Sequence, residues 1–436
     1  MSAGEEERGK REGGGRTLAG LMLFFSLSAT AAPLPEVVAR VLEANPDVRS
    51  SAALLRAADA AVWQARSNFM PSVGVQQISG SSRDRPAGAS GYSDNRTHRQ
   101  EAFLRWPLFN GYADYYINRS AEYSQDAAGS DLEETRESVA LRLTEIYVEV
   151  LRLSEQLHLA QAYVEDLQRL MRDVELRAEA GRIAPVEVDQ AKSQLIAAEN
   201  ELSQQRAQYG GAHNTYRQIV GTDPDDLHVP QLNEALADDP LDTLLARAED
   251  NSPRLKAARQ RIAARDADVG TATADFLPRL NLETRKRLNA APDSSLLSDQ
   301  ERSETLQLSL EIPLGGKNFA RRIEMVEKKL VAQADADAKA LQMRTDLGDM
   351  HSNLREARYM APLLKEKTLA SYKVETGYRM QFSAGRRSLL DLLNVRNELY
   401  QALTLRNSNR FGRITTTARL ERLLGNLRLD LNPPRR

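Results

Sequence analysis

The side chains best suited to chemistry are scattered along this chain and form no catalytic pattern. None of the histidines has a second metal ligand at the spacing of a helical metal site; they are His98, His158, His213, His228 and His351. Leu314-Gly315-Gly316-Lys317 looks like a phosphate-binding loop, but Asn318 replaces the serine or threonine and the leading glycine is absent. No G-x-S-x-G motif for a serine nucleophile occurs. The sequence therefore predicts no enzyme activity, no cofactor and no bound metal.

The overall charge and the lack of cysteine exclude other classes of function. The 59 lysines and arginines nearly balance the 61 aspartates and glutamates, for a net charge of −2, so there is no signal for nucleic-acid binding. Without cysteine there is no disulfide, no thiolate metal site and no lipidated amino-terminal cysteine. The function must therefore follow from the long structural elements.

The two halves of the chain repeat each other at an offset of about 205 residues. Phe69-Met70-Pro71 corresponds to Phe276-Leu277-Pro278, and Gly181 corresponds to Gly385. Such a regular offset indicates a duplicated unit. The predicted divisions are a signal peptide at 1–32, a first repeat at 33–221, a linker at 222–240, a second repeat at 241–425 and a polar tail at 426–436.

Each repeat begins with a broken helix and continues into a pair of strands. Helices are predicted at 35–68 and 241–275, with breaks at Asn45-Pro46 and Ser252-Pro253, because proline cannot donate its amide and disfavours helix in the residue before it. A two-residue apolar period then indicates strands. The alternating apolar residues are Leu280, Leu282, Leu306, Leu308, Leu310 and Ile312 in the second half, and Leu104, Trp106 and Leu108 in the first, where Val73 and Val75 give a weaker signal. We predict two hairpins of roughly ten-residue strands, with polar loops at 80–96 and 289–302.

Very long helices are predicted after each hairpin. Residues 112–184 and 318–360 contain almost no proline and are rich in alanine, leucine, glutamate, glutamine and arginine. Segments of about 65 residues and roughly 100 Å are credible for such a composition. Heptad-like apolar spacing predicts that they pack along one another as coiled coils. A cytoskeletal-type rod would explain these helices equally well, but it would not explain the hairpins.

The amino terminus has the pattern of a secretory signal peptide. Basic residues precede an apolar run at 18–27, and small residues follow, with cleavage expected after Ala31 or Ala32. A secreted chain can enter a membrane through strands of about 9–11 residues that close into a barrel, and the smallest known barrels have about eight strands. Four strands leave open edges in lipid, so closure requires a dimer or a trimer.

The chain resembles the TolC family of bacterial outer-membrane channel-tunnels from Pro35 to Leu424. The resemblance depends on the tandem repeat, the two proline-led hairpins, and the helix junctions at 180–188 and 382–393. It implies an α+β protomer with four strands and long coiled-coil helices. It also implies a homotrimer, with a twelve-stranded β-barrel in outer-membrane lipid that continues into an α-helical tunnel across the periplasm.

The resemblance also implies a function and its partners. The protein would be a passive exit duct in a type I secretion or tripartite efflux system, docked on a periplasmic adaptor protein and an inner-membrane transporter. Protein export is the first expectation, and drug or metal efflux is the alternative. A periplasmic coiled-coil adaptor or scaffold is a weaker interpretation, because an adaptor would usually have compact β-rich domains and neither class needs two alternating hairpins.

Specific residues acquire roles by this resemblance. Three copies of Asp391 would form a ring at the closed periplasmic gate and attract cations. This attraction would be weaker here, because Asn394 stands where the family often has a second acid. Arg387 and Glu187 would tie neighbouring helices together, while Phe382 replaces a tyrosine that often adds a latch hydrogen bond. Gly181 and Gly385 would form the tip that binds the adaptor. The residues expected to face the barrel lumen are Asn281, Glu283, Arg285 and Arg287, with Leu280 and Leu282 facing lipid.

Local roles without any family also fit these residues. The two glycines can serve only to end one helix before the next begins, and Asp391 can be a solvated helix residue. Trp106 can belong to an interfacial aromatic girdle or act as a buried anchor.

Overall fold

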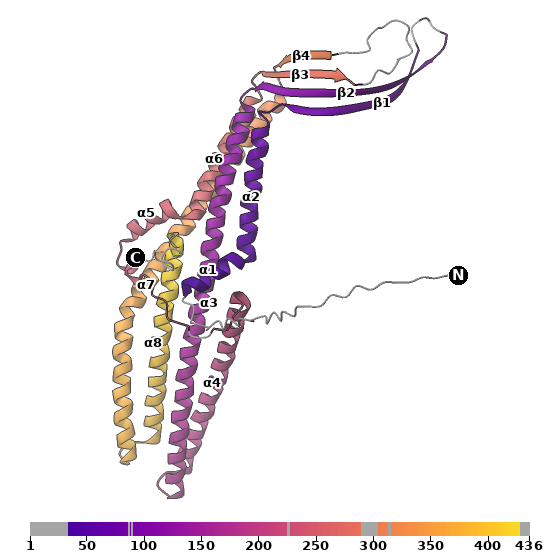
Figure 1. Ribbon diagram of the computed structural model, residues 1–436. Helices are drawn as coiled ribbons and strands as arrows, with labels where there is room; N and C mark the ends of the chain where they lie inside the picture. Colours follow the sequence, from indigo (N-terminus) through magenta and orange to yellow (C-terminus); the bar gives the residue numbers. More distant parts are fainter. Residues whose placement is uncertain are drawn as a thin grey trace, which may run out of the picture.

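A computed structural model of the chain describes residues 34–85, 88, 90–224, 227–288, 304–312 and 315–427. The predicted signal peptide, the second hairpin loop and most of the polar tail lie outside these residues. The protomer is a long column of helices with a four-stranded sheet at one end (Figure 1). No helix in the described part of the chain combines the length and apolar character needed to cross a membrane.

The predicted broken helices are confirmed in both repeats. The first repeat begins with α1 (Leu34–Ala44) and α2 (Pro46–Ser67), and the second with α5 (Leu241–Asn251) and α6 (Pro253–Ala274). The Asn45 side chain accepts hydrogen bonds from the amides of Asp47 and Val48. Proline at the first helical position and an asparagine cap are what begin a helix efficiently.

The four strands form one antiparallel sheet in the order β1-β2-β3-β4. They are β1 (Ser72–Asp84), β2 (Ser93–Asn110), β3 (Arg279–Arg287) and β4 (Glu304–Glu311). Pairing of β2 with β3 joins the two repeats. The predicted loop at 80–96 is wrong for most of its length, because the ladder continues to Asp84 opposite Ser93. Polar composition misled the prediction: such residues also pair across strands, as Arg83 and Asp94 do at 2.6 Å.

A β-bulge corrects the predicted alternation at the end of β2. Pro107 pairs with Asn281, but the next pair joins Phe109 to Leu280, so Leu108 is the extra residue. Phe109 therefore lies on the apolar face, at the position that the alternation predicted for Leu108. Proline has no amide to donate to the ladder, and bulges are where strands accommodate it.

Four long helices form the column together with α2 and α6. They are α3 (Ala113–Glu179), α4 (Pro185–Val220), α7 (Gly316–Ser383) and α8 (Leu389–Leu423), of which α3 and α7 have 67 and 68 residues. Near the sheet, α3 packs between α2 and α6, and α6 packs on α7; farther away, α3 packs between α4 and α8, and α8 packs on α7. Helix α7 begins at Gly316 and continues past an internal Pro362.

The linker between the repeats is fastened around the middle of the column. It contains the short helix η1 (Glu234–Ala237). The hydroxyl of Tyr147 on α3 donates to the carbonyl oxygen of His228 at 3.0 Å and accepts from its amide at 2.8 Å. Burial raises the pKa of the Tyr147 hydroxyl, so it stays neutral. Arg413 of α8 pairs with Glu234 at 2.9 Å. These contacts hold the two repeats together far from either end.

Candidate functional site

The helical end of the column consists of two hairpin tips built in the same way. Gly181 has φ 69° and Gly385 has φ 71°. The next amide in each turn closes back on the helix, from Arg182 to the Arg177 carbonyl and from Arg386 to the Gln381 carbonyl, both at 2.8 Å. This is the glycine-dependent end of a helix. The predicted helix stops are thus confirmed, and their role in binding a partner stays a prediction.

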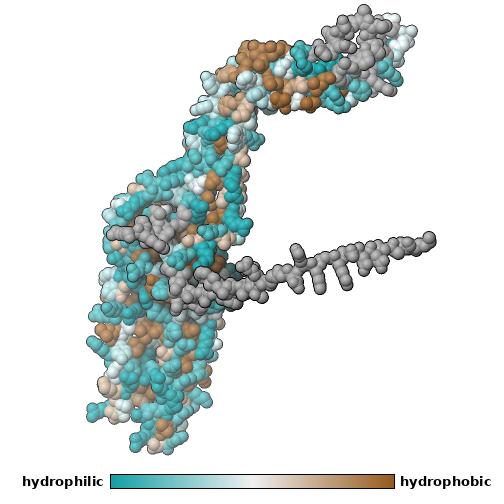
Figure 2. Space-filling model, viewed as in Figure 1, coloured by the Kyte–Doolittle hydropathy of each residue, from teal (hydrophilic) through white to brown (hydrophobic). Residues whose placement is uncertain are grey.

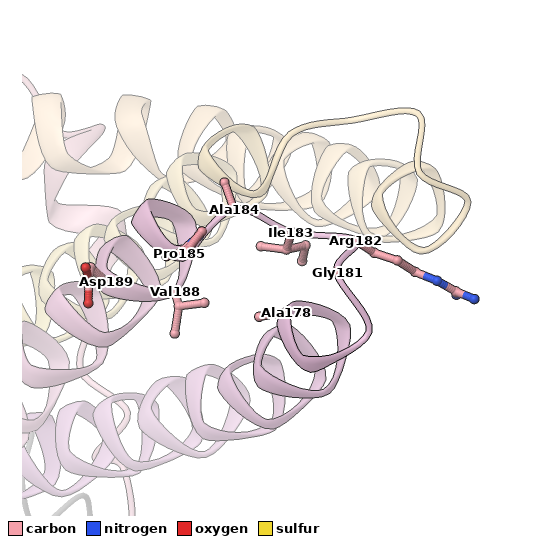
Figure 3. Close-up of a pocket in the computed structure, with 8 residues that line it drawn as sticks. All are labelled: Ala178, Gly181, Arg182, Ile183, Ala184, Pro185, Val188 and Asp189. Carbon is pink, nitrogen blue, oxygen red and sulfur yellow. The ribbon is translucent and has the colours of Figure 1, made fainter.

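Both tip glycines are open to solvent. No atom lies within 4 Å of the position that a Cβ would take at either residue. Gly181 lines a shallow depression with Ala178, Ile183 and Val188, from which the Arg182 side chain points away (Figure 3). A partner helix can therefore reach the backbone here without displacing any side chain.

Arg387 is held within its own hairpin. Its guanidinium lies 3.6 Å from the Asp391 carboxylate, donates to the Gln381 side chain at 3.1 Å, and stacks 4.4 Å from the centre of the Tyr378 ring. Asp391 is half-buried, and Asn394 is exposed one turn later. A positive charge therefore accompanies each Asp391, which reduces the negative field that this residue alone would produce.

Glu187 lies near Arg387 but does not pair with it inside one protomer. Its carboxylate accepts from the Ala184 amide at 3.3 Å and so caps α4. Among the described residues of one chain, no ion pair joins Glu187 to Arg387, although both line one depression between the tips. The predicted pair therefore has to form, if it forms, between copies or after a side-chain rotation.

Arg177 makes a contact between the two hairpins that sequence reasoning missed. From α3 it donates to the Phe382 carbonyl at the end of α7, at 3.3 Å, and its guanidinium stacks 4.9 Å from the Phe382 ring centre. The guanidinium also forms an ion pair with Asp173 at 3.1 Å. Phe382 has no hydroxyl, and this contact joins the two hairpins through its backbone and ring.

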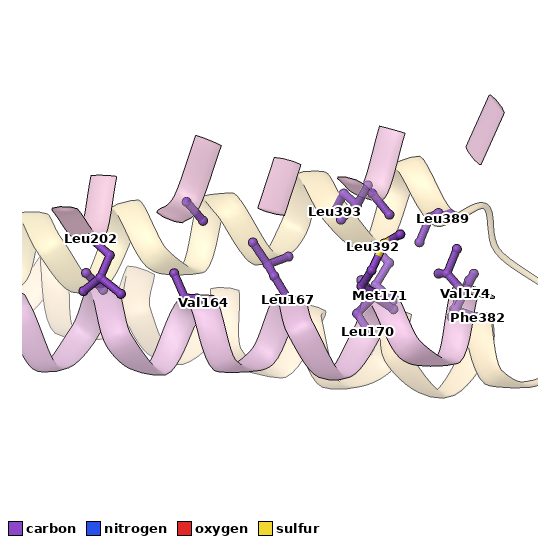
Figure 4. Close-up of a cluster of buried hydrophobic side chains, with 13 residues drawn as sticks. Val164, Leu167, Leu170, Met171, Val174, Leu202, Phe382, Leu389, Leu392 and Leu393 are labelled. Atoms are coloured by element: carbon purple, nitrogen blue, oxygen red, sulfur yellow. The ribbon is translucent and has the colours of Figure 1, made fainter. Parts of the chain in front are cut away.

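Beneath the tips, the two hairpins share one apolar core (Figure 4). Its buried side chains come from α3, α4, α7 and α8, and include Leu170, Val174, Ala191, Phe382, Leu389 and Leu392. Above it, the nearly buried Arg396 and Glu375 pair at 3.3 Å, and Tyr163 stacks on Tyr400 with ring centres 4.6 Å apart. Burial raises the pKa of both tyrosines. The tips of one protomer therefore form a single packed unit.

At the other end of the column, one face of the sheet is apolar and exposed. The register places on this face Val73, Val75, Leu104, Trp106, Leu280, Leu282, Leu306, Leu308 and Leu310. Leu306 is 74% exposed and Leu310 is 67% exposed. Hydrophobic surface gathers on the sheet in Figure 2. The Trp106 indole donates to the Phe69 carbonyl at 3.2 Å, so the tryptophan stays partly exposed while its polar group is satisfied.

The opposite face of the sheet carries charge. Asn281, Glu283, Arg285 and Arg287 all lie on it, as their alternation predicted. Glu283 pairs with Arg105 at 3.2 Å and also with Arg285. Charged groups are unstable against lipid. The two faces therefore suit lipid on one side and water on the other.

Comparison with known proteins identifies the family. The profile of the outer membrane efflux protein family matches this chain twice, at residues 37–222 and 244–426. The chain belongs to this family. The family profile thus matches each structural repeat once, which confirms the predicted duplication.

Individual relatives align over most of the chain. TolC of Vibrio cholerae is 23% identical over 427 residues, which cover 92% of this chain and 93% of that protein. Protein CyaE of Bordetella pertussis is 27% identical over 337 residues, covering 74% of this chain and 69% of that protein. The solved structure of the outer-membrane channel OprN matches with a TM-score of 0.80 at 21% identity, covering 90% of this chain and 89% of that chain.

Membership settles the location and the class of function. This outer membrane efflux protein is a transport channel of the cell outer membrane whose helices form a periplasmic tunnel, and it is not an enzyme. The α+β fold and the passive duct that the sequence predicted are confirmed.

Arg177→Met is expected to loosen the tips. The substitution keeps an unbranched apolar stem but removes the donors and the charge, which should cost about 1–3 kcal/mol for the lost hydrogen bond and cation–π contact. The tip should become more sensitive to proteolysis, and its amides should exchange faster with solvent. Arg172→Met, at an exposed position of the same helix, is the matched control. Equal rates of proteolysis and of amide exchange in the two variants would show that Arg177 does not hold the tips together.

Proposed function

We propose that three copies of this chain close into one exit duct, a twelve-stranded barrel followed by a twelve-helix tunnel. In each protomer the outermost elements have an open side. Within the described residues, β1 and β4 each have one edge without a neighbouring strand, and α2 and α7 are the end helices of their layer. Unpaired strand edges are costly in lipid. Pairing β4 of one copy with β1 of the next satisfies every edge.

Exposed apolar side chains on the end helices support this closure. On α2, Leu54 and Trp63 are exposed, and on α7, Phe319 and Ile323 are exposed. These positions belong to helices whose other sides are packed against α3 or α6. Contact between α7 of one copy and α2 of the next would bury them.

The sheet then acquires two environments. Its apolar face contacts outer-membrane lipid, and the face with Asn281, Glu283, Arg285 and Arg287 lines the lumen. We infer that the first 32 residues direct secretion. The tips around Gly181 and Gly385 bind a periplasmic adaptor, through which an inner-membrane transporter supplies the cargo.

Protein export through a type I system is the proposed use of the duct. The alkaline protease secretion protein AprF of Pseudomonas aeruginosa is a relative at 22% identity, and supports this choice. The cobalt-zinc-cadmium resistance protein CzcC of Cupriavidus metallidurans, at 24% identity, keeps metal efflux as the second candidate. The adaptor and transporter that co-purify with the protein will separate the two, because each class of transporter is recognisable by sequence.

In mild detergent, the mature protein is expected to have a mass about three times that of one chain, since four strands alone leave two open edges. Native mass measurement on protein extracted from outer membranes tests this. A monomer in the intact membrane would contradict the proposed duct.

Asp391→Ala is expected to lower the preference of the channel for cations. Three carboxylates at a constriction concentrate cations, and their field is poorly screened where the pore is narrow. Because Arg387 lies 3.6 Å from Asp391, Arg387→Gln should shift selectivity the other way. Reversal potentials under a salt gradient in planar bilayers measure both shifts. Unchanged selectivity in both variants would place Asp391 on an outer face.

A further inference from the structure

The charged face of the sheet holds more positive than negative groups. On β2 and β3, beyond the base of the sheet, four arginines share this face with two carboxylates; they are Arg99, Arg105, Arg285 and Arg287, with Glu101 and Glu283. At the base of the sheet, Arg279 stands opposite Glu311, so that pair adds no net charge. We propose that the exit barrel is an electropositive segment that selects acidic cargo. This inference depends on the proposed trimer, in which the charged face lines the lumen.

The ion pairs within this face do not remove the surplus. Glu101 is shared between Arg99 at 3.4 Å and Arg285 at 3.9 Å. Glu283 is shared between Arg105 and Arg285. Arg287 has no carboxylate within ion-pair distance among the described residues, and its Nε has no hydrogen-bond partner there. Two carboxylates are thus divided among three arginines, and the fourth keeps its full charge.

Lys286 shows that this surplus belongs to one face. It lies between Arg285 and Arg287 on β3 but points to the other side of the sheet, where Glu304 on β4 neutralises it. Arg83 and Asp94 likewise neutralise each other on that side. Among the side chains that the structure describes on these strands, positive charge without a partner is therefore found on the face that we assign to the lumen.

On β2 and β3, three copies would bring about six more positive than negative charges around one pore, where low-dielectric walls strengthen the field along the axis. Rings of arginine or lysine favour anions in pores. A polypeptide or small molecule with net negative charge would be attracted into the barrel, whereas a basic cargo would be repelled. The helical gate at Asp391 acts at the opposite end of the duct, so the two fields are separate.

Block by charged polymers tests the inference on the complete trimer. Poly-L-glutamate and poly-L-lysine of equal length are added to the barrel side of a planar bilayer that contains the purified channel. Polyglutamate is expected to block at the lower concentration. In Arg287→Gln, the blocking concentration of polyglutamate should rise about threefold, because the trimer loses three charges from one pore. In the double variant Arg285→Gln with Arg287→Gln, it should rise about tenfold. Lys286→Gln, a matched loss of one charge from the same strand, should leave it unchanged.

The outcomes separate this inference from the proposed duct. Conducting trimers that polylysine blocks as strongly as polyglutamate would overturn the inference and leave the duct intact. Arg287→Gln and Lys286→Gln giving the same block would also overturn it. The absence of any conducting trimer would overturn the duct itself. The comparison of the two polymers uses unmodified protein, so the test holds even if a variant fails to assemble.

Discussion

Gly385→Trp is expected to stop export while the trimer still assembles. The residue has φ +71° and open space around the position of a Cβ, so the indole would project outside the protomer, where we place the adaptor. A left-handed conformation costs a non-glycine residue about 1–2 kcal/mol, which is small beside a typical stability of about 5–15 kcal/mol. Gly181→Trp should act in the same way. Secretion assays and a heat-sensitive trimer band on gels measure the two properties.

Gly221 provides the matched control for strain. It also ends a helix, has φ +81° and has open space around its Cβ position, but it lies at the end of α4, away from the tips. Gly221→Trp should therefore leave export unchanged. Gly385→Asn adds a second comparison, because asparagine adopts this conformation readily. Loss of the trimer in Gly385→Trp, or loss of export in Gly221→Trp, would favour a role limited to the turn.

Most of the fold was predictable because local sequence patterns determine its strands and its helix breaks. A two-residue period gave the two faces of the strands, and prolines gave the helix breaks, since both features act over a few residues. The extra residue Leu108 was not predictable in the same way, because the bulge depends on how Pro107 meets the partner strand β3. The length of the first hairpin was missed for a similar reason: polar residues such as Arg83 signal a loop until their cross-strand partner is known.

The site was less predictable than the fold. The close approach of Arg387 to Asp391 follows from a four-residue spacing at the start of a helix. Arg177 carries no such signal, because it is one of many arginines on α3 and its contact at Phe382 lies in the other repeat. Long-range contacts of this kind depend on how two hairpins pack, which local sequence patterns do not specify. The charge surplus of the sheet likewise required the register between β2 and β3.

Loss of either Arg387 or Glu187 is expected to raise single-channel conductance by letting the tips splay. An exposed ion pair contributes only about 0–1 kcal/mol, but three symmetric copies acting on one gate can shift its equilibrium by up to roughly 3 kcal/mol, a factor on the order of a hundred. If the two residues pair between neighbouring helices of the closed trimer, Arg387→Glu with Glu187→Arg should restore the small conductance that each single swap has raised. Recordings in planar bilayers measure it.

The contacts inside one protomer supply the competing partner. Arg387 lies 3.6 Å from Asp391, so Arg387→Glu also places two like charges four residues apart, which destabilises the turn without any role for Glu187. The double variant Arg387→Glu with Asp391→Arg separates the two causes. Arg386→Glu, the same charge change at the exposed neighbouring arginine, should leave conductance low. If the swap with Asp391 restores the closed gate and the swap with Glu187 does not, the latch is internal to each hairpin, and the contact of Arg177 with Phe382 is what joins one hairpin to the next.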